Sequence, residues 1–231
     1  MVPEGVFVII PAFNEALSID KVIAEIPKGV QEIIVVNNNS RDETSAVAKK
    51  AGATVLDEPR KGYGYACLKG MEYAATKSPE TIVFLDADYS DYPAELSQVI
   101  APIYKQNMDM VIGSRVLGQK ENGSMTPQQV FGNWLATRLI KLFFGVHYTD
   151  LGPFRAIRWD ALQKLKMEDK TYGWTVEMQL KAARHKLKIT EVPVNYKKRI
   201  GQSKVSGTVK GTVLAGYKIL LWIFKYALSS K

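Results

Sequence analysis

Short apolar runs that alternate with helical patterns are the feature that most constrains how this chain can fold. We expect strands over residues 6–10, 32–36, 53–56, 81–85, 109–112 and 188–196. Helical patterns lie between or after them, over residues 18–26, 43–51, 62–75, 93–106, 133–144, 160–166 and 175–185. Strands and helices that alternate at this spacing form βαβ units. The sequence therefore predicts an α/β fold with a mostly parallel central sheet flanked by helices.

Polar turns follow four of the predicted strands. They are PAFNE at 11–15, NNNSRD at 37–42, DAD at 86–88 and GSR at 113–115. The carboxyl ends of parallel strands share one edge of the sheet, and ligands bind just outside that edge. One polar turn would carry little weight, but four at the same edge outline a single site.

Asp86 and Asp88 are the sharpest candidates in that site. They follow the apolar run 81–85 directly, and residues two apart in extended backbone point to the same side. Two neighbouring carboxylates repel each other, and Mg²⁺ commonly binds one or two carboxylates together with substrate phosphates. The alternative is an Asp-rich turn that caps a helix beginning near Pro93. The other three polar turns favour the metal site.

Charge is unevenly distributed along the 231 residues, whose formal net charge is +8. Residues 1–150 hold 14 Lys and Arg against 18 Asp and Glu, whereas residues 151–231 hold 17 against 5. The basic half predicts an anionic partner, such as phosphate, nucleic acid or a membrane surface; a solvated basic surface is the alternative. No recognised nucleic-acid module is present, so we expect no nucleic-acid partner.

The compartment follows from two further features. The single cysteine, Cys67, excludes an internal disulfide and is typical of a reducing compartment. The first residues lack the basic and apolar regions of a signal peptide. We therefore expect a cytoplasmic protein.

Three loops complete the predicted site. KGYGYA at 61–66 predicts a tight turn near phosphate, although it lacks the third glycine of a dinucleotide-binding loop. KKRIGQSK at 197–204 combines a glycine and a hydroxyl with Lys and Arg, which suits a phosphate clamp; an exposed loop is the alternative. Residues 118–132 are polar and glycine-rich, and we expect a mobile loop over the site there.

The C-terminal segment 212–228 is an apolar, aromatic helical pattern that contains Lys218 and Lys225. Its length and its two interior charges make it a poor membrane span. An amphipathic helix that lies in a membrane interface fits the pattern. A helix packed on the sheet and a contact between copies of the chain are the alternatives.

Seven motifs, in order, resemble the family 2 glycosyltransferases of the GT-A fold. They are IIPAFNE (9–15), VVNNNSRDET (35–44), KGYGYA (61–66), FLDAD (84–88), GSR (113–115), DLGPFRAIR (150–158) and RIGQSK (199–204). Within that family the chain looks most like the polyprenyl-phosphate mannosyl- and glucosyltransferases of the dolichol-phosphate type. The resemblance implies a GT-A domain over 1–208, with a nucleotide-sugar-binding half (1–116) and an acceptor half (117–208), and a C-terminal amphipathic helix over 209–231.

The resemblance also implies roles for individual residues. Asp86 and Asp88 would hold Mg²⁺ or Mn²⁺ on the donor diphosphate. The implied donor-binding residues are Pro11, Phe13, Glu15, Asn37, Asn38, Asp42, Lys61, Asp86, Ala87, Asp88, Arg115, Lys198, Arg199, Ser203 and Lys204. The implied catalytic residues are Asp88, Arg115, Asp150 and Glu177, the last two near the acceptor.

The implied activity is transfer of a hexose, with inversion, from a UDP- or GDP-linked donor to a polyprenyl-phosphate lipid at the cytoplasmic face of a membrane. A family 2 enzyme that acts on a glycan or glycolipid hydroxyl is one alternative, and it needs a general base such as Asp150 or Glu177. A nucleotide-sugar-binding protein without transferase activity and a nucleotidyltransferase are others. The family commonly has Asp where this chain has Asn37, Asn38 and Asn39, which leaves the donor base open. A homo-oligomer is compatible with the sequence.

Overall fold

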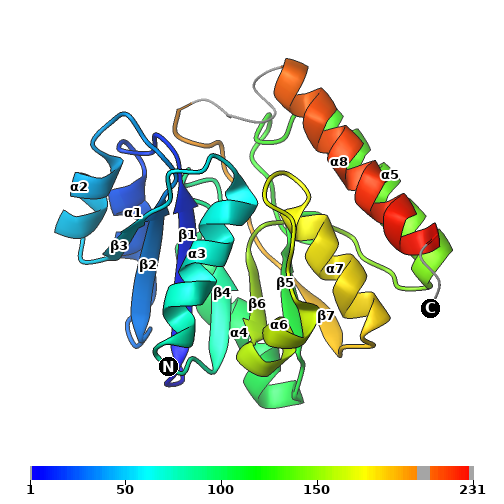
Figure 1. Ribbon diagram of the computed structural model, residues 1–231, viewed down its shortest axis with the longest axis horizontal. Helices are drawn as coiled ribbons and strands as arrows, with labels where there is room; N and C mark the ends of the chain where they lie inside the picture. The colour runs from blue at the N-terminus through cyan, green and yellow to red at the C-terminus, as the bar shows by residue number, and fades with distance from the viewer. Residues whose placement is uncertain (1, 202–208, 229–231) are drawn as a thin grey trace.

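The computed structural model describes residues 2–201 and 209–228 and contains one seven-stranded sheet with helices on both faces (Figure 1). The strands are β1 (Val6–Ala12), β2 (Glu32–Asn37), β3 (Thr54–Asp57), β4 (Thr81–Phe84), β5 (Met110–Ser114), β6 (Arg155–Arg158) and β7 (Ile189–Pro193). The helices are α1 (Ile19–Glu25), α2 (Thr44–Lys50), α3 (Tyr63–Ala75), α4 (Leu96–Gln106), α5 (Pro127–Phe144), α6 (Trp159–Leu165), α7 (Trp174–Arg184) and α8 (Val209–Leu228), with a 3₁₀ turn over Pro93–Glu95. The predicted α/β class is confirmed.

The strand order is β3-β2-β1-β4-β6-β5-β7, and β6 is the strand that runs against the others. It lies between β4 and β5 and is antiparallel to both. As a result the start of β6, rather than its end, lies at the carboxyl edge of the parallel strands. The turn before it, which begins at Asp150, is thereby brought to the same edge as the four polar turns.

Alternate residues of the central strands feed two separate cores. Ile9 of β1 and Phe84 of β4 point into the core beneath α3, α5, α6, α7 and α8, whereas Val8 and Val83 point into the core beneath α1, α2 and α4. All four are at most 1% exposed. Because both faces are covered, the strands are nearly continuous apolar runs, as the sequence indicates.

Helix α8 packs along α5 and α7 at one end of the molecule (Figure 1). Trp222 and Ile223 are its buried apolar side chains, and the ring of Phe224 lies 5.7 Å from that of Phe143 on α5. The window Gly211–Leu228 is long and apolar enough to cross a membrane by length and composition, and 17% of it is buried.

Two predictions are wrong at a boundary. The strand expected over 188–196 ends at Pro193, and the loop expected over 118–132 ends early because α5 already begins at Pro127. Thr126 is the N-cap, its hydroxyl accepts from the backbone N–H of Gln129, and the Gln129 side chain accepts from the backbone N–H of Thr126. Pro127 supplies the first helical residue, where its missing N–H costs nothing. This capping box outweighs the low helix propensity of Gly132.

Replacing Thr126 with Ala should lower the free energy of unfolding by about 1 kcal/mol, because it removes the acceptor for an N-terminal N–H of α5. Urea unfolding followed by circular dichroism measures the loss. Thr126→Ser keeps the hydroxyl and is the matched control. An equal loss in both variants would contradict the capping role.

Candidate active site

A pocket of about 680 Å³ opens at the carboxyl edge of the sheet. Strand ends form one wall, residues of the 171–175 segment another, and α5 and α8 the far side. The structure brings eight of the predicted residues to it: Pro11, Phe13, Glu15, Asp86, Ala87, Asp88, Arg115 and Arg199. The predicted clustering of polar turns therefore corresponds to one cavity.

Asp86 lies just past the end of β4, deep in the pocket. The hydroxyl of Tyr63, at the start of α3, donates to its Oδ1 at 3.0 Å. Burial and then the charge of Asp88 raise the pKa of Asp86 to about 6. The two carboxylates thus repel each other, as the sequence pattern predicts.

Asp88 is held from both sides. The backbone N–H and hydroxyl of Ser90 donate to Oδ1 at 3.0 and 2.6 Å, and the guanidinium of Arg199 pairs with Oδ2 at 2.5 Å. The backbone N–H of Ile200 donates to the Asp88 carbonyl at 2.9 Å. The described part of the basic loop is therefore folded directly onto the carboxylate pair.

The residues present fit a hard divalent cation. Across residues 2–201 and 209–228, no group of three or more His, Cys, Asp or Glu side chains is placed to hold a metal. Among the described residues, the adjacent carboxylates of Asp86 and Asp88 line the pocket. Two such ligands suit an ion whose remaining ligands are phosphate oxygens and water. A divalent ion there would also offset the burial and the repulsion from Asp88 that together raise the pKa of Asp86.

Arg115 is anchored by Asp150. Its Nε and backbone N–H both donate to Asp150 Oδ2 at 2.8 Å, and Nη2 donates to Oδ1 at 2.7 Å. Burial alone would raise the pKa of Asp150, but the charge and hydrogen bonds of Arg115 hold it below the usual value. A fully buried carboxylate in this state is a poor base, so the contacts favour a role for Asp150 in aiming Arg115.

Glu177 is likewise engaged away from the pocket. It is fully buried, it accepts from the backbone N–H groups of Glu168 and Asp169 at 2.9 and 2.8 Å, and it pairs with Lys181 at 2.8 Å. Neither Glu177 nor Asp150 lines the pocket. These contacts favour a structural role for Glu177 over that of general base.

Asn38 has a role that the sequence did not reveal. Its Nδ2 donates to the carbonyls of Glu58 and Arg60 at 3.1 and 2.7 Å, and its Oδ1 accepts from the backbone N–H of Gly62 at 2.8 Å. Only an amide supplies donors for two carbonyls and an acceptor for the N–H. The Asn at this position therefore secures the loop that leads into α3.

The other predicted donor-binding residues that the structure describes are Asn37, Asp42, Lys61 and Lys198. Asn37 donates to Asp57 at 2.8 Å, and Asp42 accepts from the backbone N–H groups of Ala16 and Thr44, both at 3.1 Å. The ammonium of Lys61 lies 5.9 Å from the ring centre of Phe13. Lys198 is exposed and its backbone N–H donates to Glu121. Ser203 and Lys204 lie outside the described residues.

Asp91 and Tyr196 are features that the sequence interpretation missed. Asp91 is 2% exposed, and within the described part of the chain neither carboxyl oxygen has a hydrogen-bond partner. Burial, and next the charge of Asp86, raise the pKa of Asp91 well above its usual value. Tyr196 lines the pocket and lies under the Arg115 guanidinium at 5.0 Å. The third Asp of DADYSD was the signal available for Asp91.

Comparison with known proteins gives a consistent result. The family model described as "Glycosyl transferase family 2" matches residues 7–166. An uncharacterized glycosyltransferase of Mycobacterium tuberculosis is 35% identical over 218 residues, which is 93% of this chain and 96% of that protein. An undecaprenyl-phosphate mannosyltransferase of Micrococcus luteus is 30% identical over 220 residues, 89% of each, and a dolichyl-phosphate hexose transferase of Haloferax volcanii is 30% identical over 213, 90% of this chain and 89% of that one.

A solved structure resembles the fold over nearly the whole chain. It is glucosyl-3-phosphoglycerate synthase from Mycobacterium tuberculosis, crystallised with Mn²⁺, uridine diphosphate and phosphoglyceric acid. The TM-score is 0.77 at 21% identity, covering 98% of this chain and 79% of that chain. The likeness shows a shared fold, the GT-A fold that the motifs predict.

Replacing Asn38 with Asp should destabilise the protein by about 1–3 kcal/mol, because a carboxylate would face two carbonyl oxygens that lose their donor. Chemical unfolding measures this loss. Asn39→Asp makes the same change at the next, exposed residue and should alter stability little. Equal effects at both positions would show that the Asn38 contacts contribute nothing.

Proposed function

The chain belongs to glycosyl transferase family 2, and on that premise we propose that it transfers a hexose, with inversion, from a UDP- or GDP-linked donor to a lipid phosphate. One observation carries this proposal: a single pocket joins the Asp86 and Asp88 carboxylates and the cations Arg115 and Arg199 to an apolar wall built by α5 and α8. Such a pocket has a polar end for phosphates and an apolar end for a lipid.

The donor belongs at the polar end. Asp86 and Asp88 would hold Mg²⁺ or Mn²⁺, which supplies Lewis-acid stabilisation of charge on the departing nucleoside diphosphate. Pro11, Phe13 and Ala87 line the pocket beside them and offer apolar contact to base and ribose. The solved relative in fold was crystallised with Mn²⁺ and uridine diphosphate, which supports a metal and a nucleotide at this end.

A phosphate acceptor agrees with the carboxylates that the chain offers. A phosphate monoester has a second pKa near 6 and is already a nucleophile at neutral pH, so no base is required. Asp150 and Glu177, the expected base candidates, are buried and bound to other groups. Arg115 and Arg199 reach the pocket and supply fixed positive charge for phosphate oxygens. Relatives named for undecaprenyl and dolichyl phosphate support this acceptor class.

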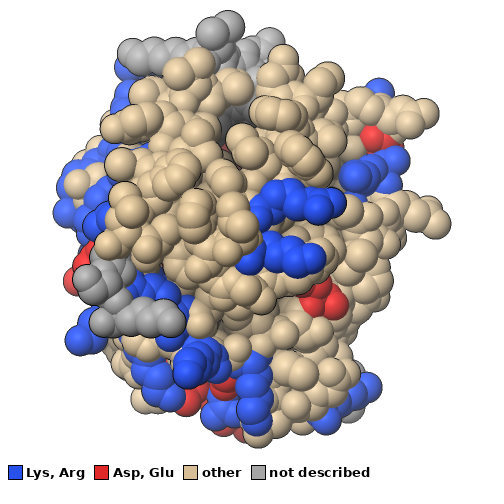
Figure 2. All heavy atoms as spheres, turned by 90° about the vertical axis from the view of Figure 1, so that its right-hand side faces the viewer, with Lys and Arg blue, Asp and Glu red and all other residues tan. Residues whose placement is uncertain are grey.

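The lipid must reach the pocket from a membrane, and the outer face of α5 and α8 suits that contact. We call this surface the α5–α8 face; its exposed apolar side chains are Val130, Phe131, Trp134, Leu142, Phe143, Val213, Leu214, Tyr217, Leu221, Phe224 and Leu228. Figure 2 looks onto this side of the molecule, which is largely uncharged with Lys and Arg across and around it. An apolar face with basic side chains suits an anionic membrane surface, here the cytoplasmic one.

Calorimetric titration of UDP and GDP, with and without Mn²⁺, tests the donor site. We expect one nucleotide to bind in a metal-dependent manner, and Asp88→Asn to abolish the metal-dependent part because one of two carboxylate ligands is lost. Asp160→Asn, on an exposed Asp, is the matched control. Metal-dependent binding that survives Asp88→Asn would refute the assigned metal site.

Flotation with anionic vesicles tests the α5–α8 face. The double substitution Leu221→Gln and Phe224→Gln should weaken vesicle binding by about tenfold or more, because it removes two apolar side chains from the contact. Leu17→Gln changes a side chain that is also exposed but lies beside α1, so binding should stay unchanged. Equal binding by all three proteins would exclude this face.

A further inference from the structure

We propose that Asp169 is a positioning residue through which helix α8 controls the geometry of the metal-binding carboxylates. The inference rests on the proposed function to the extent that it takes Asp86 and Asp88 as the metal site. Asp169 lies in the loop between α6 and α7, is 2% exposed, and does not line the pocket. One set of contacts joins Asp169 to α8, and a second set joins it to the loop before α7, which leads to the metal site.

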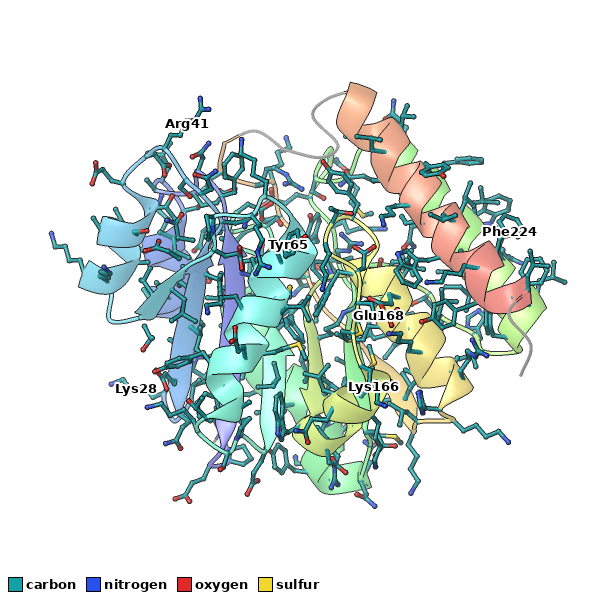
Figure 3. All side chains as sticks on the ribbon, in the orientation of Figure 1. Lys28, Arg41, Tyr65, Lys166, Glu168 and Phe224 are labelled. Carbon is teal, nitrogen blue, oxygen red and sulfur yellow. The ribbon has the colours of Figure 1, made fainter. Side chains whose placement is uncertain are left out.

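On one side Asp169 fastens α8. Its Oδ2 accepts from the indole N–H of Trp222 at 2.6 Å and pairs with the ammonium of Lys218 at 3.2 Å. Gly173 allows this approach, because a Cβ at that position would overlap the Trp222 ring. Trp222 is buried, whereas Phe224, two residues further on, is exposed and belongs to the α5–α8 face (Figure 3 labels Phe224).

The other oxygen of the same carboxylate shapes the loop. Asp169 Oδ1 accepts from the backbone N–H groups of Thr171 and Gly173 at 2.7 and 3.0 Å. Glu177 holds the preceding backbone N–H groups, and Thr171 lines the pocket. One buried carboxylate therefore binds both α8 and the loop. If α8 moved away, Asp169 Oδ2 would lose its donors, and a buried charge without partners is costly in free energy.

The loop in turn sets the start of α3. The carbonyl of Lys170 accepts from the backbone N–H of Tyr65 at 3.1 Å (Figure 3 labels Tyr65). A Cβ at Gly64 would overlap the Asp169 carbonyl, and one at Gly62 would overlap that of Lys170. The two glycines of KGYGYA are thus required by this loop as well as by the turn, since only glycine permits so close a backbone approach.

The start of α3 reaches the metal site through one side chain. Tyr63 is the first residue of α3, and its hydroxyl donates to Asp86. The contacts therefore run from Trp222 through Asp169, the Lys170 carbonyl and the first turn of α3 to Asp86. A shift of α8, the helix that carries half of the α5–α8 face, would move the carboxylate that binds the metal.

Coupling of this kind must be reciprocal: what α8 does to the metal site, the metal must do to α8. A role confined to local packing would not show this. The test therefore measures both directions, with Mn²⁺ alone as the probe and the full chain in solution without membrane.

In the first direction, Mn²⁺ affinity is measured by calorimetry. Trp222→Phe keeps an aromatic ring but removes the donor to Asp169, and Mn²⁺ binding should weaken by about fivefold or more. Trp134→Phe makes the same change at an exposed position on α5 and should leave the affinity unchanged. If Trp222→Phe folds poorly, the same measurement is made on Asp169→Asn, with Asp160→Asn as its matched control.

In the second direction, amide hydrogen exchange of α8 is compared with and without Mn²⁺. Mn²⁺ should slow exchange in α8 of the wild-type chain. Tyr63→Phe removes the hydrogen bond to Asp86. Without Mn²⁺, amide exchange in α8 of this variant should equal that of the wild-type chain, and Mn²⁺ should not slow it. If Mn²⁺ leaves amide exchange in α8 of the wild-type chain unchanged, or if Trp222→Phe and Trp134→Phe bind Mn²⁺ with equal affinity, the coupling is refuted but the metal site is not. No Mn²⁺ binding by the wild-type chain would instead refute the metal site itself.

Discussion

The repulsion between two carboxylates at the end of a buried strand is the constraint on which the rest of the site depends. Asp86 and Asp88 lie together past β4, and burial and then the charge of Asp88 raise the pKa of Asp86. The surroundings compensate from separate parts of the chain: Tyr63 from α3, Ser90 from the following turn and Arg199 from the basic loop. Holding this pair therefore fixes where α3 begins and where the basic loop lies.

Asp150 is a further carboxylate of the site, and its role is to position another side chain. The antiparallel β6 brings the turn before it to the active edge, and there Asp150 binds Arg115 with three hydrogen bonds. A buried carboxylate that is already bound aims a cation well but accepts a proton poorly. Glu177 and Asp169 act in the same manner on the loop before α7. The Arg115 guanidinium thus faces the pocket, and the carboxylates that hold this region lie behind it.

The sequence predicted much of the fold because the strands are nearly continuous apolar runs between polar turns. The five predicted strands up to β5 are present within one or two residues, and eight predicted residues line the pocket. The start of α5 was missed because Gly132 resembles a loop residue while the capping box at Thr126 is short. The roles of Asn38 and Asp150 were not readable because the groups they bind lie 20 or more residues away in the sequence. Glu177 binds backbone N–H groups, which carry no sequence signal.

The sequence by itself determined the α/β class, the edge of the sheet that carries the site, and the Asp86 and Asp88 pair, because each of these follows from residues close together in the chain. Only the tertiary structure decided that β6 enters between β4 and β5, that Arg199 lies on Asp88, and that Trp222 and Asp169 join the C-terminal helix to the site. Those contacts connect segments separated by 50 residues or more, or by a change of strand order. Contacts between segments so far apart depend on how the whole core packs, and no local sequence pattern encodes that packing.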